Sequence, residues 1–399
     1  MRKIFICRLT RNHFRSPNLS YSIKSLILIT SSTLSNLSSS VFFLLIFFFA
    51  FVSPIHGSNR HAPLFIFGDS FLDAGNNNYI NTTALDQANF WPYGETYFNF
   101  PTGRFSDGRL ISDFIAEYAK LPLVPPYLQP GNNQYYGGVN FASGGAGALV
   151  ETFEGSVIPL KTQARNYKKV AAFLRHNLGK SEAKLLLSNA VYMFSIGSND
   201  YLSPFLTDSD VLKSYSHSEY VAMVVRNMTS IIKGIYKRGA RKFVLMNLPP
   251  LGCLPGTRII DVEENGKCLQ ELSNLASLHN RVLHVVLLQL ENKLKGFKFA
   301  LYDFHTDVTQ MMNHPFKYGL KEGKSACCGS GRLRGEYSCG GKRGQKEFEL
   351  CKKPNTYLFW DSYHLTESAY KNIADRMWGF SNSSYNIGPY TIRHFFQLS

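Results

Sequence analysis

Short apolar runs alternate with longer amphipathic segments along this chain. Four runs have the length and composition of buried strands and are centred near Phe65, Phe194, Val244 and Leu301. Between them lie helix-length segments in which apolar residues recur every three or four positions, at 107–121, 160–178, 218–239 and 269–294. Strands that alternate with helices are typical of a parallel sheet with helices on both faces. The pattern therefore predicts an α/β fold.

No internal repeat or long linker divides the chain after residue 57. With 399 residues and 44% apolar content, the chain can bury a sizeable core. We therefore predict one α/β domain over residues 58–399. In such a domain, ligands bind outside the carboxyl ends of the parallel strands.

The first 57 residues have the order of a secretory signal. They carry six Lys and Arg residues and no Asp or Glu, and an apolar run covers 41–52. That run is shorter than the roughly 20 residues that span a membrane. We predict that 1–57 is a signal peptide cleaved near Gly57, which makes the mature protein secreted and extracellular. An uncleaved anchor is the alternative.

Charge narrows the possible partners. Removing the leader lowers the formal net charge from +15 to +9, and the remaining excess gathers between Lys321 and Lys353. Neither interleaved aromatic residues nor a known module points to a nucleic-acid partner. A solvated basic loop is one interpretation of this stretch. Weak attraction to anionic wall or lipid surfaces is the other.

Six cysteines lie outside the leader, and an even number in a secreted chain favours disulfides. We do not expect the adjacent Cys327 and Cys328 to pair with each other. We predict a Cys253–Cys268 bond and two bonds among the other four cysteines. Zinc is the competing use, but the spacings do not give paired C-x-x-C ligands. We expect no metal and no cofactor, and three glycosylation sequons predict exposed positions at Asn81, Asn227 and Asn382.

A candidate nucleophile stands at the end of the first predicted strand, where Ser70 follows "FIFGD". A serine hydroxyl needs a base within hydrogen-bond reach to act as a nucleophile. His364 in "FWDSYHLTESAY" is the candidate base, and Asp361 three residues earlier could hold its ring in the required tautomer. Either motif alone also fits a turn or a helix start.

Acyl transfer also needs hydrogen-bond donors for a developing oxyanion. Gly144 and Gly145 in "NFASGGAGAL" allow close approach of the backbone, and Asn199 in "FSIGSNDY" follows another predicted strand. The glycine stretch lacks the Lys and Ser/Thr of a phosphate-binding loop. An ordinary Asx turn is the alternative for "GSND".

Taken together, "GDS", "SGGAG", "GSND" and "DSYH" make the chain similar to the SGNH hydrolases. Within them it resembles the plant GDSL esterases/lipases, and the resemblance runs from Pro63 to about Gly379 through "GDSFLDAGNNN", "PTGRFSDGRLISDFIAEYAKLP", "NLPPLGCLP" and "ACCGSG". It implies a three-layer α/β/α, flavodoxin-like fold with a central, mostly parallel sheet. It also implies a secreted carboxylic-ester hydrolase that acts on lipid or other acyl esters through an acyl-enzyme.

The resemblance assigns roles to the triad. Ser70 would be the nucleophile, His364 the general base and acid, and Asp361 the residue that orients His364. Two other functions remain open: an acyltransferase with the same triad, in which an alcohol replaces water, and a non-catalytic secreted binding or signalling protein on a hydrolase scaffold.

The resemblance also assigns an oxyanion hole. The backbone N–H groups of Ser70 and Gly144 would form it together with the side-chain amide of Asn199. Asp73 and Asn76 match the extended first motif and would support it structurally.

One position departs from the usual family pattern. Leu365 follows the candidate histidine where the family usually has proline. A subgroup that resembles the defence-associated secreted GDSL lipases shares this feature, which implies a stress or defence role. The identity of the ester stays open, because likeness to a subgroup is an analogy.

Overall fold

The computed structural model describes residues 61–260, 266–380 and 386–398. Within them a six-stranded sheet has the order β10-β5-β4-β3-β1-β2. Its pairs are parallel except for β10 against β5. The four strands predicted from apolar runs are confirmed as β1, β3, β4 and β5. The strands are β1 (Leu64–Gly68), β2 (Gly138–Asn140), β3 (Val191–Ser195), β4 (Lys242–Met246), β5 (Lys298–Tyr302) and β10 (Ile387–Gly388).

The order of β2, β1, β3, β4 and β5 is the flavodoxin-like order of a doubly wound sheet. The predicted fold class is therefore confirmed. In this topology the chain runs from β1 to one side of the sheet for β2 and to the other side for β3. The switch point, where ligands bind in such folds, lies at the carboxyl end of β1. Ser70 follows that end.

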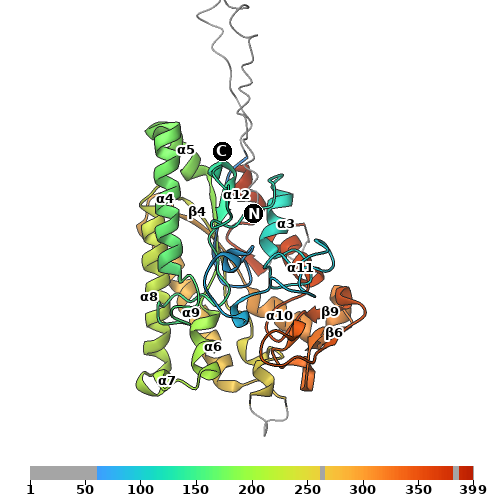
Figure 1. The fold of residues 1–399 in the computed structure, drawn as a ribbon. Coiled ribbons are helices and arrows are strands. Elements are labelled where there is room, and N and C mark those ends of the chain that lie inside the picture. Colours follow the sequence, from blue (N-terminus) through green and yellow to red (C-terminus); the bar gives the residue numbers. More distant parts are fainter. Residues whose placement is uncertain (1–60, 261–265, 381–385, 399) are drawn as a thin grey trace, which may run out of the picture. The chain divides into compact units, whose positions relative to one another are not determined.

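Helices cover both faces of the sheet and complete three layers (Figure 1). One layer holds α4 (Leu160–Leu178), α5 (Lys180–Asn189), α8 (His217–Tyr236) and α9 (Gln270–Lys293). The other holds α3 (Ile111–Tyr118), α11 (Glu367–Trp378) and α12 (Ile392–Gln397). The remaining helices are α6 (Ser198–Leu206), α7 (Val211–Ser214) and α10 (Phe304–Asn313).

The four predicted helices are confirmed, with one shortened. The segment predicted at 107–121 becomes helical only at Ile111, because the Asp113 carboxylate accepts the Leu110 N–H at 2.8 Å and caps the helix there. Asp107 lies outside the helix and accepts the Glu367 N–H at 2.7 Å. This bond ties the segment before α3 to the start of α11.

The central strands are apolar on both faces, as expected for a sheet between two helical layers. All five residues of β1 and of β3 are buried. Phe67 of β1 stacks on Phe194 of β3 with 4.8 Å between ring centroids, and on Phe141 at 5.0 Å. Aromatic packing of this kind fixes the register of β1 beside β3, and that register sets the position of the residues that follow β1.

Three disulfides brace the loops that follow β4 and β5. They join Cys253 to Cys268, Cys327 to Cys351, and Cys328 to Cys339. The predicted pairing is therefore confirmed. The last two bonds lie among two small sheets, formed by β6 (Glu322–Ala326) with β9 (Tyr357–Phe359) and by β7 (Cys328–Gly329) with β8 (Glu349–Leu350).

Several predictions concern the surface and the termini. Asn81 and Asn227 are exposed, as expected for glycan acceptors, whereas Asn382 and the predicted signal peptide 1–57 lie outside the described residues. Among the described helices, none is both long and apolar enough to cross a membrane.

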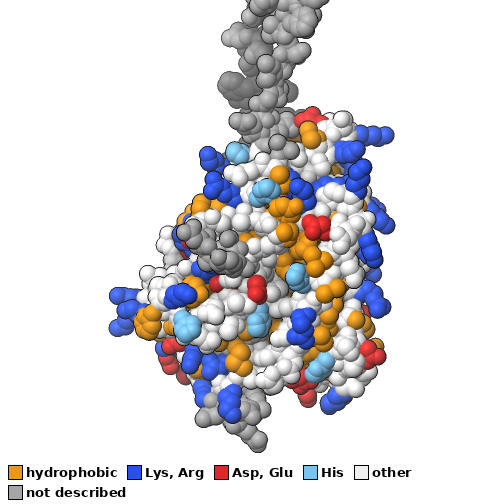
Figure 2. Space-filling model, turned by 180° about the vertical axis from the view of Figure 1, so that it is seen from behind, with side chains coloured by type: hydrophobic (Ala, Val, Ile, Leu, Met, Phe, Trp, Pro, Cys, Tyr) orange, Lys and Arg blue, Asp and Glu red, His pale blue; other side chains and the backbone are white. Residues whose placement is uncertain are grey.

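The basic stretch 321–353 is only partly free surface. Arg343 is buried, and Arg334 pairs with Glu349 at 2.7 Å. Figure 2 shows Lys and Arg side chains spread mainly around the margins of one face of the molecule rather than gathered at one place. The predicted attraction to anionic wall or lipid surfaces stays a prediction.

Candidate active site

Ser70 sits in a tight turn directly after β1. Gly68 ends the strand at φ +154°, where an added Cβ would come within 2.2 Å of the Ser195 carbonyl oxygen on β3. The Asp69 N–H then donates to that same oxygen at 3.0 Å. The N–H of Leu72 donates back to the Asp69 carbonyl at 3.1 Å and closes the turn. Close contact between β1 and β3 thus requires glycine before the turn. The turn places Ser70 just beyond the carboxyl end of β1.

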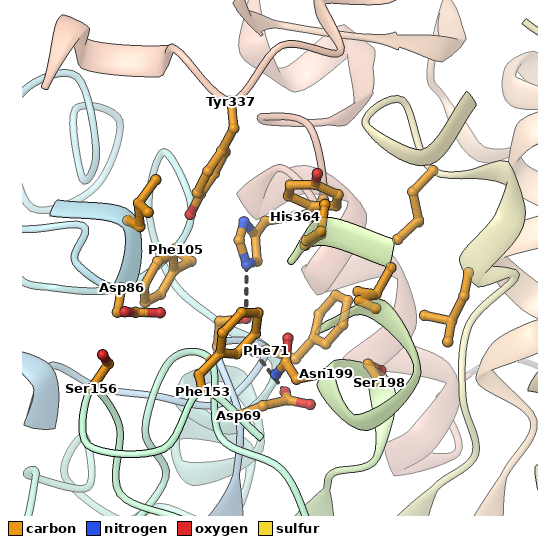
Figure 3. Close-up of a pocket in the computed structure, with 18 of the residues that line it drawn as sticks. Asp69, Phe71, Asp86, Phe105, Phe153, Ser156, Ser198, Asn199, Tyr337 and His364 are labelled. Atoms are coloured by element: carbon orange, nitrogen blue, oxygen red, sulfur yellow. Dashed lines mark hydrogen bonds between the residues drawn. The ribbon is translucent and has the colours of Figure 1, made fainter. Parts of the chain in front are cut away.

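The structure brings the predicted nucleophile, base and acid together. His364 Nε2 lies 2.8 Å from Ser70 Oγ, the contact drawn as a dashed line in Figure 3. His364 Nδ1 lies 2.7 Å from Asp361 Oδ1. The histidine stands in the loop between β9 and α11, just before Thr366, which caps α11. Two hydrogen bonds therefore link Ser70 to Asp361 through His364. Ser70 and His364 are 294 residues apart in the sequence.

Asp361 is fully buried and held by several donors. Its Oδ1 accepts the backbone N–H groups of Tyr363 and His364, both at 2.9 Å. Its Oδ2 accepts the Tyr93 hydroxyl at 2.6 Å. Burial raises the pKa of Asp361, but the nearby His364, Arg343 and Tyr93 outweigh it and hold the pKa well below its usual range. Asp361 is therefore ionised at neutral pH.

Tyr93 and Arg343 are site residues that sequence reasoning missed. Arg343 Nη1 donates to the Tyr93 hydroxyl at 2.6 Å, and this hydroxyl donates in turn to Asp361. The same guanidinium lies 3.9 Å from the centre of the Tyr337 ring, a cation–π contact. Because 250 residues separate Tyr93 from Arg343, no spacing in the sequence marks the pair.

The predicted oxyanion donors need one correction. The Gly144 N–H donates to Asp73 Oδ2 at 2.9 Å, so this N–H is already engaged and does not face the cavity. Asp73 also accepts the N–H groups of Gly75 and Asn76 through Oδ1, at 2.8 and 2.7 Å. Asp73 thus fixes the glycine loop, and the predicted donor role of Gly144 does not fit this geometry.

Gly145 is the member of the glycine pair that lines the cavity. In the described part of the chain, no residue accepts a hydrogen bond from the N–H of Gly145 or of Ser70. Asn199 also lines the cavity, and its Nδ2 donates one proton to the Ala146 carbonyl at 3.0 Å, which leaves a second proton. These three groups are open donors around Ser70.

A cavity of about 440 Å³ surrounds the Ser70–His364 pair (Figure 3). Its lining is mainly apolar and aromatic, and it includes Phe71, Leu85, Phe105, Phe153, Leu202, Leu206, Leu251, Leu254, Tyr337 and Tyr363. Among the described residues that line it, none is Lys or Arg. A cavity of this kind suits a neutral, largely apolar ligand.

Comparison with known proteins agrees with this geometry. Residues 64–377 match the family described as GDSL-like Lipase/Acylhydrolase, which covers most of the chain. The chain belongs to the GDSL lipase/acylhydrolase family.

Three curated relatives extend this match. GDSL esterase/lipase 5 of Arabidopsis thaliana is 56% identical to this GDSL hydrolase over 347 residues, or 86% of this chain and 89% of that one. GDSL esterase/lipase 1 of the same plant is 52% identical over 343 residues, 85% of this chain and 91% of that one. A GDSL lipase of Tanacetum cinerariifolium is 47% identical over 340 residues, 85% and 89% of the two chains. The protein is thus a carboxylic ester hydrolase.

Asp69 gives the site of this GDSL hydrolase an unusual carboxyl group. Its Oδ1 accepts the Phe71 N–H at 3.1 Å, while its buried Oδ2 has no partner among the described residues. Burial is the main reason that the pKa of Asp69 rises to about 8. The carboxyl group beside Ser70 is therefore mostly neutral at pH 7, so it does not oppose negative charge on a reacting oxygen.

A second cavity of about 560 Å³ adjoins the first. Phe153 and Thr207 line both cavities, so these two side chains separate them. Phe153 has a positive φ of 45°, which is uncommon for a residue other than glycine. The exposed sequon residue Asn227 stands on the lining of this second cavity.

Proposed function

We propose that this GDSL hydrolase cleaves carboxylic esters through an acyl-enzyme on Ser70. The observation that supports the proposal is the unbroken hydrogen-bond chain from Ser70 through His364 to the buried, ionised Asp361. A serine becomes nucleophilic when a base lies within hydrogen-bond reach and a third group orients that base. Both conditions are met, and Ser70 and His364 line one mainly apolar cavity.

The reaction then proceeds in two halves. Ser70 Oγ attacks the ester carbonyl carbon while His364 Nε2 takes the hydroxyl proton, and a tetrahedral oxyanion forms. The C–O bond to the alcohol breaks, His364 returns the proton to the departing alkoxide, and the acyl group stays on Ser70. In the second half His364 takes a proton from water while the water oxygen attacks the acyl carbon, and a second tetrahedral oxyanion forms. The bond between the acyl carbon and Ser70 Oγ then breaks, His364 returns the proton to Ser70, and the acid leaves.

The oxyanion would be stabilised by three donors: the N–H groups of Ser70 and Gly145 and the second amide proton of Asn199. Preorganised donors of this kind commonly account for a large part of the rate enhancement. Gly145 replaces Gly144 in this role because the Gly144 N–H is bonded to Asp73.

We further propose that the protein acts outside the cell. Three disulfides and two exposed sequons support this, since disulfides persist in oxidising compartments. The predicted leader at 1–57 would direct export. Likeness to the defence-associated subgroup supports a stress or defence role, and the substrate is a lipid or another acyl ester.

Replacement of Ser70 tests the proposal. The purified secreted protein would be assayed on an acyl chain-length series of neutral esters, as wild type and as Ser70→Ala, with Ser230→Ala as a control on the exposed face of α8. We expect Ser70→Ala to lower kcat/KM by about a thousandfold or more and Ser230→Ala to change little. Full activity of Ser70→Ala with its fold intact would refute the proposal. Adding a competing alcohol shows whether the acyl group also passes to acceptors other than water.

A further inference from the structure

We propose that Asp86 forms a binding site for the alcohol portion of the ester, so that the enzyme favours alcohols with free neutral hydroxyl groups and disfavours anionic ones. This inference rests on the proposed function, because it names the substrate class of the same cavity. It begins with the polar side chains on the cavity wall.

One side of the cavity wall carries a carboxylate. Thr83, Asp86 and Ser156 line it, and Figure 3 shows Asp86 and Ser156 on one side of His364 with Asn199 on the other. Asp86 ends the short 3-10 helix η3 (Ala84–Asp86). Asp86 and Ser156 thus lie on the side of His364 opposite Asn199, the proposed oxyanion donor.

Other elements give the cavity an apolar wall. Leu202 and Leu206 come from α6, and Leu251 and Leu254 come from the segment that follows β4. None of these four side chains can hydrogen-bond a substrate, so together they suit the hydrocarbon of an acyl chain. The polar lining residues of α6, Ser198 and Asn199, stand at its first turn. The alcohol portion of the ester would then bind on the side of the cavity that holds Asp86.

The Asp86 carboxylate lies close to the proposed point of reaction. A Cβ added to Gly145 would lie 2.7 Å from Asp86 Oδ1, so this oxygen is next to the glycine that we assign to the oxyanion hole. A hydroxyl group on the second or third carbon of a short alcohol would therefore be within reach of Asp86.

The carboxylate also has an open acceptor. Asp86 Oδ2 accepts the Thr82 hydroxyl at 3.3 Å, whereas Oδ1 accepts no hydrogen bond from the described residues. Burial raises the pKa of Asp86 to about 6, so the group is mostly ionised above that pH. No Lys or Arg is found among the described lining residues, and the positive charge that acts on Asp86 is that of Arg343 behind the segment, whose effect on the pKa is smaller than that of burial.

Arg343 holds this segment in place from behind. Its Nε donates to the Ala84 carbonyl at 2.9 Å, and its Nη2 donates to the Gln87 carbonyl at 2.6 Å. These bonds lie on both sides of Asp86 along the chain. The acceptor is therefore positioned before a substrate arrives, which lowers the entropy lost on binding.

The test compares three octanoate esters that differ only in the alcohol. They are 1-monooctanoylglycerol with neutral hydroxyls, methyl octanoate with none, and octanoylglycolate with an anionic carboxylate. We expect wild-type kcat/KM to be highest for the glycerol ester. Asp86→Ala should lower that value about tenfold, the size expected for a hydrogen bond to a charged group, and should leave the methyl ester within about twofold.

A second variant separates charge from hydrogen bonding. Asp86→Asn keeps an acceptor but removes the negative charge, so we expect kcat/KM for octanoylglycolate to rise about fivefold, since a buried like charge no longer repels it. The control is Asp210→Asn, which removes an exposed carboxylate outside the cavity and should leave all three values unchanged.

The outcomes separate the two proposals. Equal losses on the glycerol and methyl esters in Asp86→Ala, with no gain on octanoylglycolate in Asp86→Asn, would overturn the alcohol site while ester hydrolysis stands. Wild-type preference for octanoylglycolate would overturn it as well. If the wild type cleaves none of the three esters, or Ser70→Ala cleaves them all, the proposed function fails and the alcohol site fails with it.

Discussion

Tyr93→Phe removes one oxygen atom from the buried centre of the site. The Tyr93 hydroxyl donates to Asp361 at 2.6 Å and accepts from Arg343 at 2.6 Å. The Tyr93 ring has no exposed surface, and it packs edge-on against Phe105 and Trp360. Phenylalanine keeps these ring contacts, so the variant isolates the loss of the hydroxyl.

The effect on stability follows from two buried charged groups that each lose a partner. Each such loss costs about 1–3 kcal/mol, so we expect the free energy of unfolding to fall by about 2–6 kcal/mol. This corresponds to a decrease of roughly 4–12 °C in Tm. The depressed pKa of Asp361 keeps this carboxylate ionised in the folded protein well below the unfolded-state value of about 4, so the loss should be the same from pH 7 down to pH 4.

The effect on activity should appear in the pH profile. The titratable and charged groups nearest His364 are Asp361, Tyr337, Tyr363 and, through Tyr93, Arg343. Without the Tyr93 hydroxyl, Asp361 holds the protonated imidazole more strongly, and the uncharged base is then less populated at low pH. The acid limb of kcat/KM should therefore move to higher pH by about half a unit or more.

The matched control is Tyr167→Phe. Tyr167 is equally buried, and its hydroxyl bonds to the neutral hydroxyl of Tyr192 at 2.9 Å. We expect a smaller loss, about 1 kcal/mol, and no movement of the acid limb. Thermal unfolding and a kcat/KM series from pH 4 to 9 measure both effects. If the two variants lose equal stability and neither profile moves, the reasoning about Tyr93 is wrong.

Two further predictions concern the cavity wall. Because burial raises the pKa of Asp69 to about 8, its neutral form stabilises the fold at low pH and that contribution is lost as the pH rises through 8. The Tm of Asp69→Asn relative to wild type should therefore increase between pH 5 and 8, and a constant difference would contradict the assignment. Phe153→Ala should join the two cavities and move the best acyl chain to greater length, measured on a series of methyl esters. An unchanged optimum would show that the second cavity takes no acyl chain.

Much of the fold could be predicted because the longer strands and helices show a clear pattern of apolar residues along the sequence. The strands that became β1, β3, β4 and β5 are apolar runs, and α4, α8 and α9 are long amphipathic segments. The short strands β2 and β10 have three and two residues, which is too few for any period to show. Their place in the sheet depends on pairing with distant strands rather than on their own residues.

The site divides in the same way. Ser70, His364 and Asp361 lie in local motifs, so they could be predicted as a triad from the sequence. The sequence could not show whether Gly144 or Gly145 supplies the oxyanion donor, because the two glycines are adjacent in the motif and of the same residue type. The direction of each N–H depends on backbone angles and on the distant carboxylate of Asp73.

The remaining site residues act through contacts over long distances in sequence. Tyr93, Asp86 and Arg343 reach the triad or the cavity only after folding, and each stands in an unremarkable segment. Alternation and spacing describe neighbours along the chain. They therefore contain no information on a tyrosine that bridges an arginine and an aspartate from opposite ends of the domain.

Substitutions in the G-D-S motif at residues 68–70 should have different effects at different positions. Gly68 is fixed by packing: its N–H and carbonyl both bond to the Gln163 amide, at 2.9 and 2.8 Å, and β3 leaves no room for a side chain. The variant Gly68→Ala should therefore fail to fold and be lost in a selection for folded protein. Ser70→Ala should pass that selection and fail one for turnover. A library of variants at these positions, screened separately for folding and for turnover, should therefore show that folding requires Gly68 and that turnover requires Ser70.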